Sequence, residues 1–180
     1  QVPDETPWKN GADAPEYMYT SGDTVDFQLG TDPAADPKRG QAVRGDLRLS
    51  IGNFQGTPTA VLYQPIAPEG TVGKPRTFSS GTVREYKVGS IRVLKSAKIH
   101  IALGENAYTI EAVIPLSALG LSIKPGQKLR ADFGITHSDP NGLDTTLRIW
   151  WNNQATAIIN DEVFELKLEP RNWGVLEFSK

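Results

Sequence analysis

Residues 128–154, KLRADFGITHSDPNGLDTTLRIWWNNQ, contain two runs of alternating apolar and polar residues around a short turn sequence. Successive side chains of a β-strand point to opposite faces of the sheet, so this alternation predicts half-buried strands. The turn residues Asp-Pro-Asn-Gly, which begin at Asp139, predict a reversal of the chain between the runs. The segment therefore predicts an antiparallel hairpin with strands at 128–138 and 145–154.

Two adjacent tryptophans, Trp150 and Trp151, cannot lie on the same face of one strand. The register of the hairpin must bring the apolar residues of both strands together, because a slip of one residue would send one set to solvent. This argument predicts that Trp151 lies in the core and that Trp150 stands on the opposite, outer face. The other apolar residues expected beside Trp151 are Leu129, Ala131, Phe133, Ile135, Leu147 and Ile149.

The outer face of the hairpin is predicted to present Trp150 among polar side chains. A pyranose has apolar C–H faces that pack on an indole ring, and its hydroxyls pair with planar guanidinium, carboxylate and carboxamide groups. Gly134 on the neighbouring strand would leave room for a ligand to approach the sheet. The pattern therefore predicts a saccharide site. Its expected ligand-binding residues are Trp150, Arg148, Asp132, Asn152 and Arg130.

A second interpretation of Trp150 needs no ligand. In that interpretation, the long loops or the N-terminal segment cover the indole, and Arg148 and Asp132 form an ordinary cross-strand ion pair. The two interpretations differ in what lies against the indole, and the pattern alone leaves both open.

The remaining sequence also predicts short strands joined by turns. Pro115 and Gly120 suit the start and the end of one very short helix, near 115–120. Residues 1–20 are expected to form an irregular segment laid over the sandwich, and residues 65–82 a loop. Further strands are expected at 23–30, 46–54, 59–65, 82–97, 98–104, 107–115, 163–170 and 173–180.

This succession of strands predicts an all-β fold, an antiparallel β-sandwich resembling a jelly roll, in a single domain over residues 1–180. Each strand that alternates cleanly places its apolar residues in the core between the two sheets. Outside the hairpin, the predicted core residues are Phe27, Leu47, Leu49, Ile51 and Ile110.

Composition excludes several classes of function. The net charge of −2 gives no reason to expect a nucleic-acid partner, and no apolar run approaches the roughly 20 residues that span a bilayer. The absence of cysteine excludes disulfides, thiolate metal ligands and cysteine nucleophiles. Because Gln1 cannot be a natural translation start, we expect a mature form or a piece of a longer protein.

The order of motifs resembles that of a known family. The segments YTIEAVIPLSALGLSIKPGQKLRADFGITHSD (108–139) and TTLRIWWNNQATAIINDEVFELKLEPRNWGVLEF (145–178) carry the pattern EAxIPxSxLGL, PGxxLRxDFG and a closing PxNWG. Together with SGDTVDFQLGTDP (21–33), they resemble family 9 carbohydrate-binding modules and the related DOMON-like domains. The resemblance extends over most of residues 20–178.

The resemblance implies a non-catalytic module that binds a saccharide or polysaccharide. It also implies a secreted or periplasmic bacterial protein in which this module is one of several domains. Members of the family clamp a sugar between two aromatic side chains, and many hold structural calcium. Trp150 is the candidate for one clamp residue, and its possible partners are Trp8, Tyr17, Tyr19 and Trp173.

Two loops have the composition of a calcium site, because calcium takes carboxylate and carbonyl oxygens as ligands. The hairpin loop offers Asp139, Asn141 and Asp144, and the loop at 30–37 offers Asp32 and Asp36. The alternative for the hairpin loop is an ordinary turn, since Asn and Gly tolerate positive φ.

Nothing in the sequence singles out a catalytic site, so we expect the protein not to be an enzyme. His100 alternates outward from two isoleucines, His137 precedes a turn, and no G-x-S-x-G motif is present. DOMON-like haem binders use methionine and histidine ligands, so Met18 keeps a haem domain as a minor alternative. The other alternative is a structural or partner-binding sandwich without a small ligand.

Overall fold

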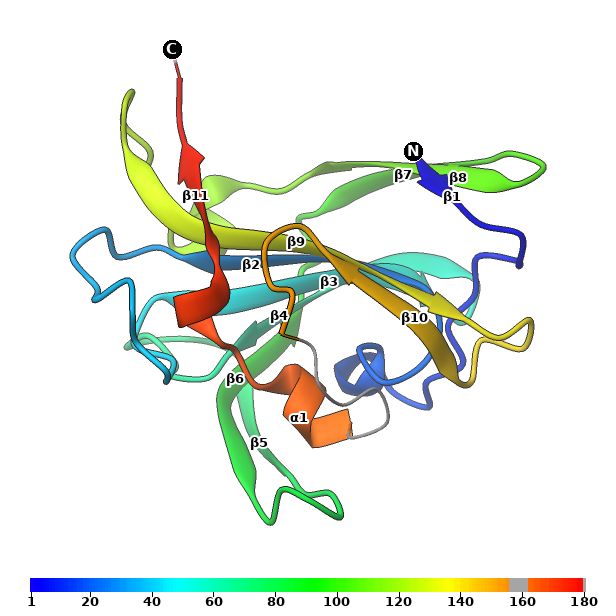
Figure 1. Cartoon of the computed structure of the whole chain (residues 1–180), viewed down its shortest axis with the longest axis horizontal. Helices are drawn as coiled ribbons and strands as arrows, with labels where there is room; N and C mark the ends of the chain where they lie inside the picture. The colour runs from blue at the N-terminus through cyan, green and yellow to red at the C-terminus, as the bar shows by residue number, and fades with distance from the viewer. Residues whose placement is uncertain (156–161, 180) are drawn as a thin grey trace.

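The computed structural model describes residues 1–155 and 162–179 (Figure 1). It confirms the predicted all-β sandwich, in which two antiparallel sheets pack together. The small sheet has the strand order β1-β8-β7, and the large sheet has the order β10-β9-β2-β3-β4-β6-β5, with β11 also paired to β9. The strands are β1 (Val2–Pro3), β2 (Thr24–Gly30), β3 (Asp46–Phe54), β4 (Thr57–Gln64), β5 (Lys74–Phe78), β6 (Tyr86–Val93), β7 (Lys98–Leu103), β8 (Ala107–Val113), β9 (Lys128–Ser138), β10 (Thr145–Trp150) and β11 (Gly174–Glu177).

The hairpin of β3 and β4 illustrates how local sequence produces this sheet. Gln55 and Gly56 form its two-residue turn with φ values of 50° and 79°. Positive φ at both turn positions matches the right-handed twist of the strands that the turn joins. Register then follows, and Leu49 lies opposite Leu62 on the face that meets the small sheet.

The main core lies between the two sheets. Leu47, Leu49 and Ile51 of β3 are buried there as predicted, and Phe27 and Ile110 are partly buried against them. The predicted helix near 115–120 is the 3-10 turn η2 (Leu116–Leu119), which ends at Gly120 in the left-handed region. η2 contributes Leu119 to this core, so it closes one end of the sandwich.

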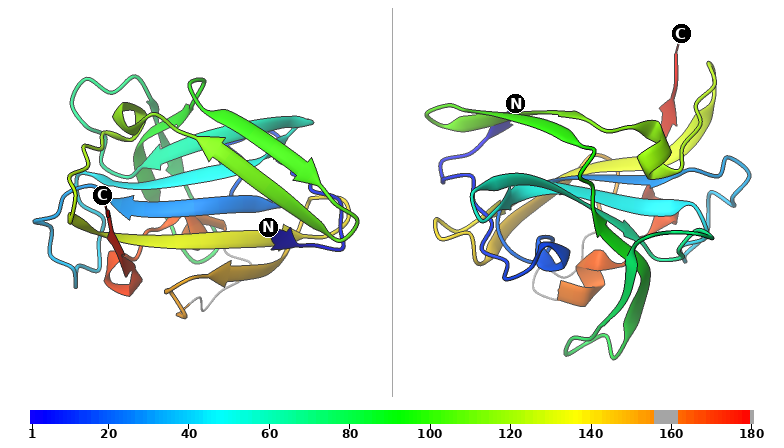
Figure 2. Two further views of the ribbon diagram at one scale, coloured as in Figure 1. Left: turned by 90° about the horizontal axis from the view of Figure 1, so that it is seen from above. Right: turned by 180° about the vertical axis from the view of Figure 1, so that it is seen from behind.

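A second core lies on the other face of the large sheet. The N-terminal segment, with the 3-10 turn η1 (Pro15–Tyr17), and the helix α1 (Glu162–Leu166) cover this face (Figures 1 and 2). Met18 and Tyr19 from the first and Val163 and Leu166 from the second pack against strand residues such as Tyr63. The large sheet is therefore covered on both faces along part of its width.

The predicted hairpin register is confirmed, but the predicted burial of its apolar face is wrong. Ile149 pairs with Ile135 and Trp150 with Gly134, as the alternation requires. Seen from above, β7 and β8 cross the middle of the large sheet and leave β10 uncovered (Figure 2). Trp151 is consequently 53% exposed and lies just beyond the end of β10. Three further residues expected in the core are exposed for the same reason, namely Phe133, Leu147 and Ile149.

Two other segments differ from the sequence prediction. The expected strand at 163–170 is replaced by α1 and an irregular stretch that leads into the 3-10 turn η3 (Pro170–Asn172), because Val163 and Leu166, three residues apart, bury one helical face in the second core. The expected loop at 65–82 contains β5, which forms one edge of the large sheet. Register is irregular between Lys74 and Arg76 in the edge strand β5 and between Thr145 and Leu147 in β10, which shares its edge of the sheet with β11.

None of the helices in the described part of the chain has both the length and the apolar character needed to cross a membrane.

Candidate functional site

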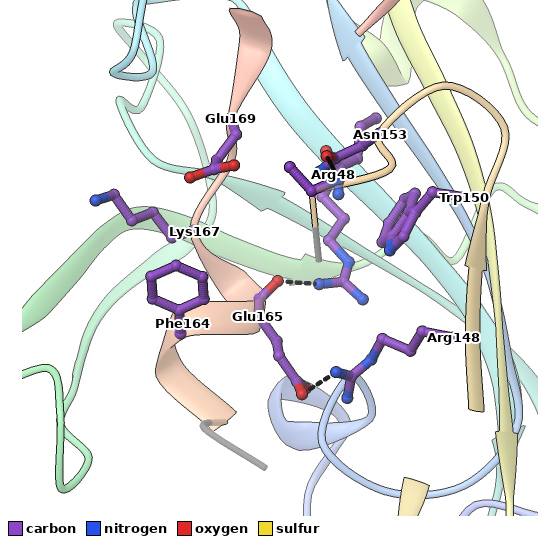
Figure 3. A pocket seen from close by; sticks show the side chains of 10 residues that line it. Arg48, Arg148, Trp150, Asn153, Phe164, Glu165, Lys167 and Glu169 are labelled. Carbon is purple, nitrogen blue, oxygen red and sulfur yellow. Dashed lines mark hydrogen bonds and ion pairs between the residues drawn. The ribbon is translucent and has the colours of Figure 1, made fainter. Parts of the chain in front are cut away.

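A pocket opens on the face of the large sheet that α1 covers (Figure 3). Strands β2, β3 and β10 form its floor, and the residues around α1 form the opposite wall. The cavity volume is about 50 Å³. The pocket is lined by Gln28, Arg48, Arg148, Trp150, Asn153, Ala155, Phe164, Glu165, Lys167 and Glu169.

Trp150 forms one wall of the pocket, and its indole lies directly over Gly134 of the neighbouring strand. A Cβ atom at position 134 would come within 2.5 Å of an indole carbon, so only glycine fits below the ring in this arrangement. We expected Gly134 to leave room for a ligand, and this expectation is wrong because Trp150 itself fills the space. The glycine instead lets the indole lie close against the sheet.

Arg48 fixes the inner side of the indole. Its guanidinium carbon lies 5.8 Å from the centre of the Trp150 ring and 5.6 Å from that of Tyr19, within the range of cation–π attraction. The same guanidinium donates two hydrogen bonds of 2.9 Å to the Asp26 carboxylate. Burial is the largest single effect and lowers the pKa of Arg48, but the attraction and hydrogen bonding of Asp26, together with the charges of Tyr63 and Glu165, raise its pKa overall, so the charge is retained.

Glu165 anchors α1 to the sheet through both of its acceptor groups. Its backbone carbonyl accepts a hydrogen bond of 2.8 Å from Arg48, and its carboxylate pairs with Arg148 (Figure 3). Burial lowers the pKa of Arg148 and the nearby charge of Arg48 lowers it further, while the Glu165 carboxylate opposes both effects. Two buried ion pairs therefore hold the polar floor of the pocket in one geometry.

Of the five predicted ligand-binding residues, the structure brings only Trp150 and Arg148 into the pocket. The predicted alternative, an ion pair between Arg148 and Asp132, is also not found, since Arg148 pairs with Glu165. The buried Asp132 carboxylate accepts backbone N–H groups of Phe133, Asn152 and Asn153, at 2.9 to 3.0 Å. Asp132 thus shapes the bend that follows β10 and is not presented to the pocket.

The other two predicted residues lie outside the pocket. The side chain of Asn152 is exposed and donates a hydrogen bond of 2.7 Å to the carbonyl of Asn172. Arg130 is part-buried near the start of β9, where it pairs in register with Gly30 and Val175. Both residues belong to the structural junction between β9, β11 and the bend.

Sequence analysis missed most of the pocket lining. Gln28 and Arg48 are polar residues in strands whose polar and apolar residues alternate. The pattern therefore predicted which residues share their face, but it did not predict that β2 and β3 lie near β10. Phe164 lies across the pocket from Trp150 (Figure 3), and its segment was expected to be a strand. Only knowledge of the strand order and of α1 brings these residues together.

The suggested clamp partners of Trp150 have other positions. Trp8, Tyr19 and Trp173 are buried, and the Trp173 indole donates a hydrogen bond of 2.8 Å to the Gln28 carboxamide oxygen. Tyr17 lies below the Arg76 guanidinium and is not part of the pocket lining. Phe164 lines the pocket together with Trp150 and lies across it from the indole (Figure 3).

The predicted calcium loop is closed by its own hydrogen bonds. The Asp139 carboxylate accepts N–H groups of Asn141, Leu143 and Asp144, at 2.7 to 3.2 Å. Hydrogen bonds from Asp144 and Leu143 lower the pKa of Asp139. This geometry is that of the turn alternative, and calcium binding there stays a prediction. Asp32 and Asp36 likewise accept backbone N–H groups of their own loop.

The residues weighed for haem and catalysis are dispersed. His100 is exposed on β7, as predicted, and His137 lies beside Asp4. Met18 is buried in the second core. None of these three residues lines the pocket at Trp150.

Comparisons with family models, with curated proteins and with solved structures found no match to this chain. The resemblance to carbohydrate-binding modules therefore stays a prediction that rests on the quoted motifs.

Proposed function

We propose that this chain is a non-catalytic saccharide-binding module whose site is the pocket at Trp150. The observation that carries the proposal is the position of this indole, which is partly exposed on a pocket wall, held from below by Gly134 and stacked beside Arg48. Phe164 lies on the opposite wall (Figure 3). An apolar sugar face fits such a platform, because its C–H groups pack on the indole while its hydroxyls stay polar.

Fixed polar groups around the platform support recognition of hydroxyls. Arg48 and Arg148 are held by Asp26 and Glu165, so little side-chain freedom is lost when a ligand binds. Asn153 adds a carboxamide, and Lys167 and Glu169 add one charge of each sign. This mixture of planar donors and acceptors suits the paired hydroxyls of a neutral saccharide better than a strongly charged ligand.

The size of the cavity limits how the sugar lies. A volume of about 50 Å³ is well below the roughly 300–1,000 Å³ of pockets that enclose a small molecule. It accommodates a hydroxyl or hydroxymethyl group, so we expect the ring to lie at the mouth of the pocket. Weak binding follows from this arrangement, and it suits a module that directs a larger secreted protein to a glycan.

The test compares the two adjacent tryptophans. A glycan array identifies a ligand for the full chain, and calorimetry then measures its affinity for Trp150→Ala and for the matched control Trp151→Ala. We expect Trp150→Ala to lower the affinity at least tenfold and Trp151→Ala to change it less than twofold. Circular dichroism checks that both variants are folded, and Asn153→Ala serves as a second pocket variant if Trp150→Ala is not.

Equal affinities of the parent and the folded Trp150→Ala variant would place the site elsewhere. If the array finds no glycan ligand, the proposal fails and the alternative of a structural or partner-binding sandwich is favoured.

A further inference from the structure

Three ionisable side chains meet where the N-terminal segment joins the two sheets, away from the pocket. Asp4 follows β1, Asp23 precedes β2, and His137 lies near the end of β9. Each of them offers one carboxylate oxygen or ring nitrogen, and these atoms lie within 4.8 Å of one another. Segments from both sheets therefore contribute to one compact polar cluster.

Hydrogen bonds hold both carboxylates in place and leave one oxygen atom of Asp4 without a hydrogen bond. Asp4 accepts the N–H and the hydroxyl of Thr6 at one oxygen, Oδ1, at 2.9 and 2.7 Å. Its second oxygen, Oδ2, is buried and has no hydrogen-bond partner. Asp23 accepts N–H groups of Lys9 and Ser138, each at 2.9 Å. Such bonds to supporting groups are typical of carboxylates that are oriented for a metal ion.

The distance between the imidazole and the Asp4 carboxylate has the value expected for two ligands of one metal ion. His137 Nδ1 and Asp4 Oδ2 are 3.4 Å apart, which is longer than the usual 2.7–3.2 Å of an N–H···O hydrogen bond. Two ligand atoms about 2.0–2.1 Å from a tetrahedral zinc ion lie roughly 3.3–3.4 Å apart. A small ion between them therefore requires almost no movement of these two atoms.

Tyr108 gives a separate indication that a group is bound beside the carboxylates. Its side chain is almost completely buried, and its hydroxyl has no hydrogen-bond partner among the described residues. Tyr108 pairs in register with Val2 of β1 and lines one groove together with Asp4. A water molecule on a metal ion would accept the hydrogen of this hydroxyl.

The charge of the cluster also favours a cation. Asp4 and Asp23 bring two carboxylates into one compact group. In the described part of the chain, His137 is the only ion-pair partner of Asp4, and Asp23 pairs with neither lysine nor arginine. A divalent ion would compensate both carboxylates.

We propose that Asp4, Asp23 and His137 bind a divalent transition-metal ion such as Zn²⁺. The imidazole selects this class of ion, because calcium and magnesium prefer oxygen ligands throughout. An open groove lined by Asp4, His137, Pro3 and Leu147 connects the site to solvent. The bound ion joins the N-terminal segment to the ends of β2 and β9, and so it stabilises the contact between the two sheets.

The test titrates Zn²⁺ into the full chain after treatment with a chelator. We expect one equivalent to bind by calorimetry and the melting temperature to rise. Asp4→Asn and His137→Gln should each weaken binding at least tenfold, while the control His100→Gln, which changes the exposed histidine on β7, should not alter it. Co²⁺ serves as a spectroscopic probe, since a mixed nitrogen and oxygen site gives it visible absorption bands.

Several results would overturn the proposal. They are the absence of Zn²⁺ binding to the parent, equal binding to Asp4→Asn, or a rise in melting temperature with Ca²⁺ but not with Zn²⁺. If His137→Gln does not fold, the NMR signals of the two histidines in the parent replace it. Zn²⁺ should then shift the His137 ring signals and leave those of His100 unchanged, and the reverse pattern would contradict the assignment.

Discussion

The two adjacent tryptophans offer a direct comparison, because each lies over a glycine of a neighbouring strand. Trp150 rests on Gly134 on one face of the large sheet, and Trp151 rests on Gly174 on the other. Trp150 is also packed beside Arg48, whereas Trp151 meets Phe133 edge-on and stays about half exposed. Alternation in the sequence determined which face each indole occupies, but its burial depends on which other segments cover that face.

The two surroundings also differ in chemistry. Around Trp150 the sheet presents charged and amide side chains that are paired and fixed. Around Trp151 it presents a strip of half-exposed apolar residues, which comprises Phe133, Leu147 and Ile149. A polar face covered by α1 and an apolar face left open are the reverse of the expected arrangement for this hairpin.

The largest expected effect concerns the ion pair beneath Trp150. Arg48→Met leaves the buried Asp26 carboxylate without its cation, and breaking a buried pair in this way costs about 3–5 kcal/mol of unfolding free energy. Urea denaturation measures the loss. Arg44→Met is the control, because the Arg44–Glu69 pair is exposed and contributes about 0–1 kcal/mol. Similar losses of unfolding free energy in both variants would mean that the buried Arg48–Asp26 pair stabilises the fold no more than the exposed Arg44–Glu69 pair does.

The second comparison changes the two glycines. Gly134→Ala places a methyl group against an indole held between the sheet and Arg48, and overpacking of this kind costs about 1–3 kcal/mol. Gly174→Ala meets an indole that can turn toward solvent, so we expect a smaller loss in thermal unfolding. A larger loss for Gly174→Ala would show that Trp151 is the more constrained residue of the two.

A third prediction concerns Trp151 itself. A fully buried tryptophan would cost about 3–5 kcal/mol on truncation to alanine. Because about half of this side chain is exposed, we expect Trp151→Ala to cost only about 1–2 kcal/mol. Thermal melting of Trp151→Ala beside the parent measures the difference. A loss of about 3–5 kcal/mol, as for a buried aromatic side chain, would support the sequence prediction that Trp151 lies in the core.

The smallest expected effect is that of calcium on the hairpin loop. The Asp139 carboxylate already accepts three backbone N–H groups, so we expect only weak binding, in the millimolar range. At a calcium concentration equal to the dissociation constant, the gain in stability is about 0.4 kcal/mol. Melting curves of the parent and of Asp144→Asn, with calcium and with chelator, measure it. Identical curves for the parent in both solutions would count against a calcium site in this loop.

The sequence predicted the parts of the fold that depend on neighbouring residues. The placement of Trp150 and Gly134 on one face of the hairpin followed from the alternation of two strands around one turn. The turn η2 followed from Pro115 and Gly120. These features need no knowledge of distant segments, because periodicity and turn chemistry decide them locally.

The pocket could not be predicted in the same way. Arg48 reaches Trp150 only because β3 and β10 belong to the same sheet, with just β9 and β2 between them. The sequence does not reveal this strand order. Glu165 reaches both arginines only because residues 162–166 form a helix on that face. The alternation of VFEL suited a strand as well as a helix, and burial of Val163 and Leu166 against the N-terminal segment decided between them.

The irregular register of β10 and β5 affects how readily the large sheet can pair with another molecule at high protein concentration. A sheet edge can recruit the edge of another molecule only where its hydrogen-bonding groups form a regular row. In β10 that row is interrupted between Thr145 and Leu147, beside the open apolar strip, and in β5 it is interrupted next to Pro75. The edges at β10 and β5 thus oppose pairing with the sheet of another molecule, although an indole and an apolar strip lie in solvent beside β10.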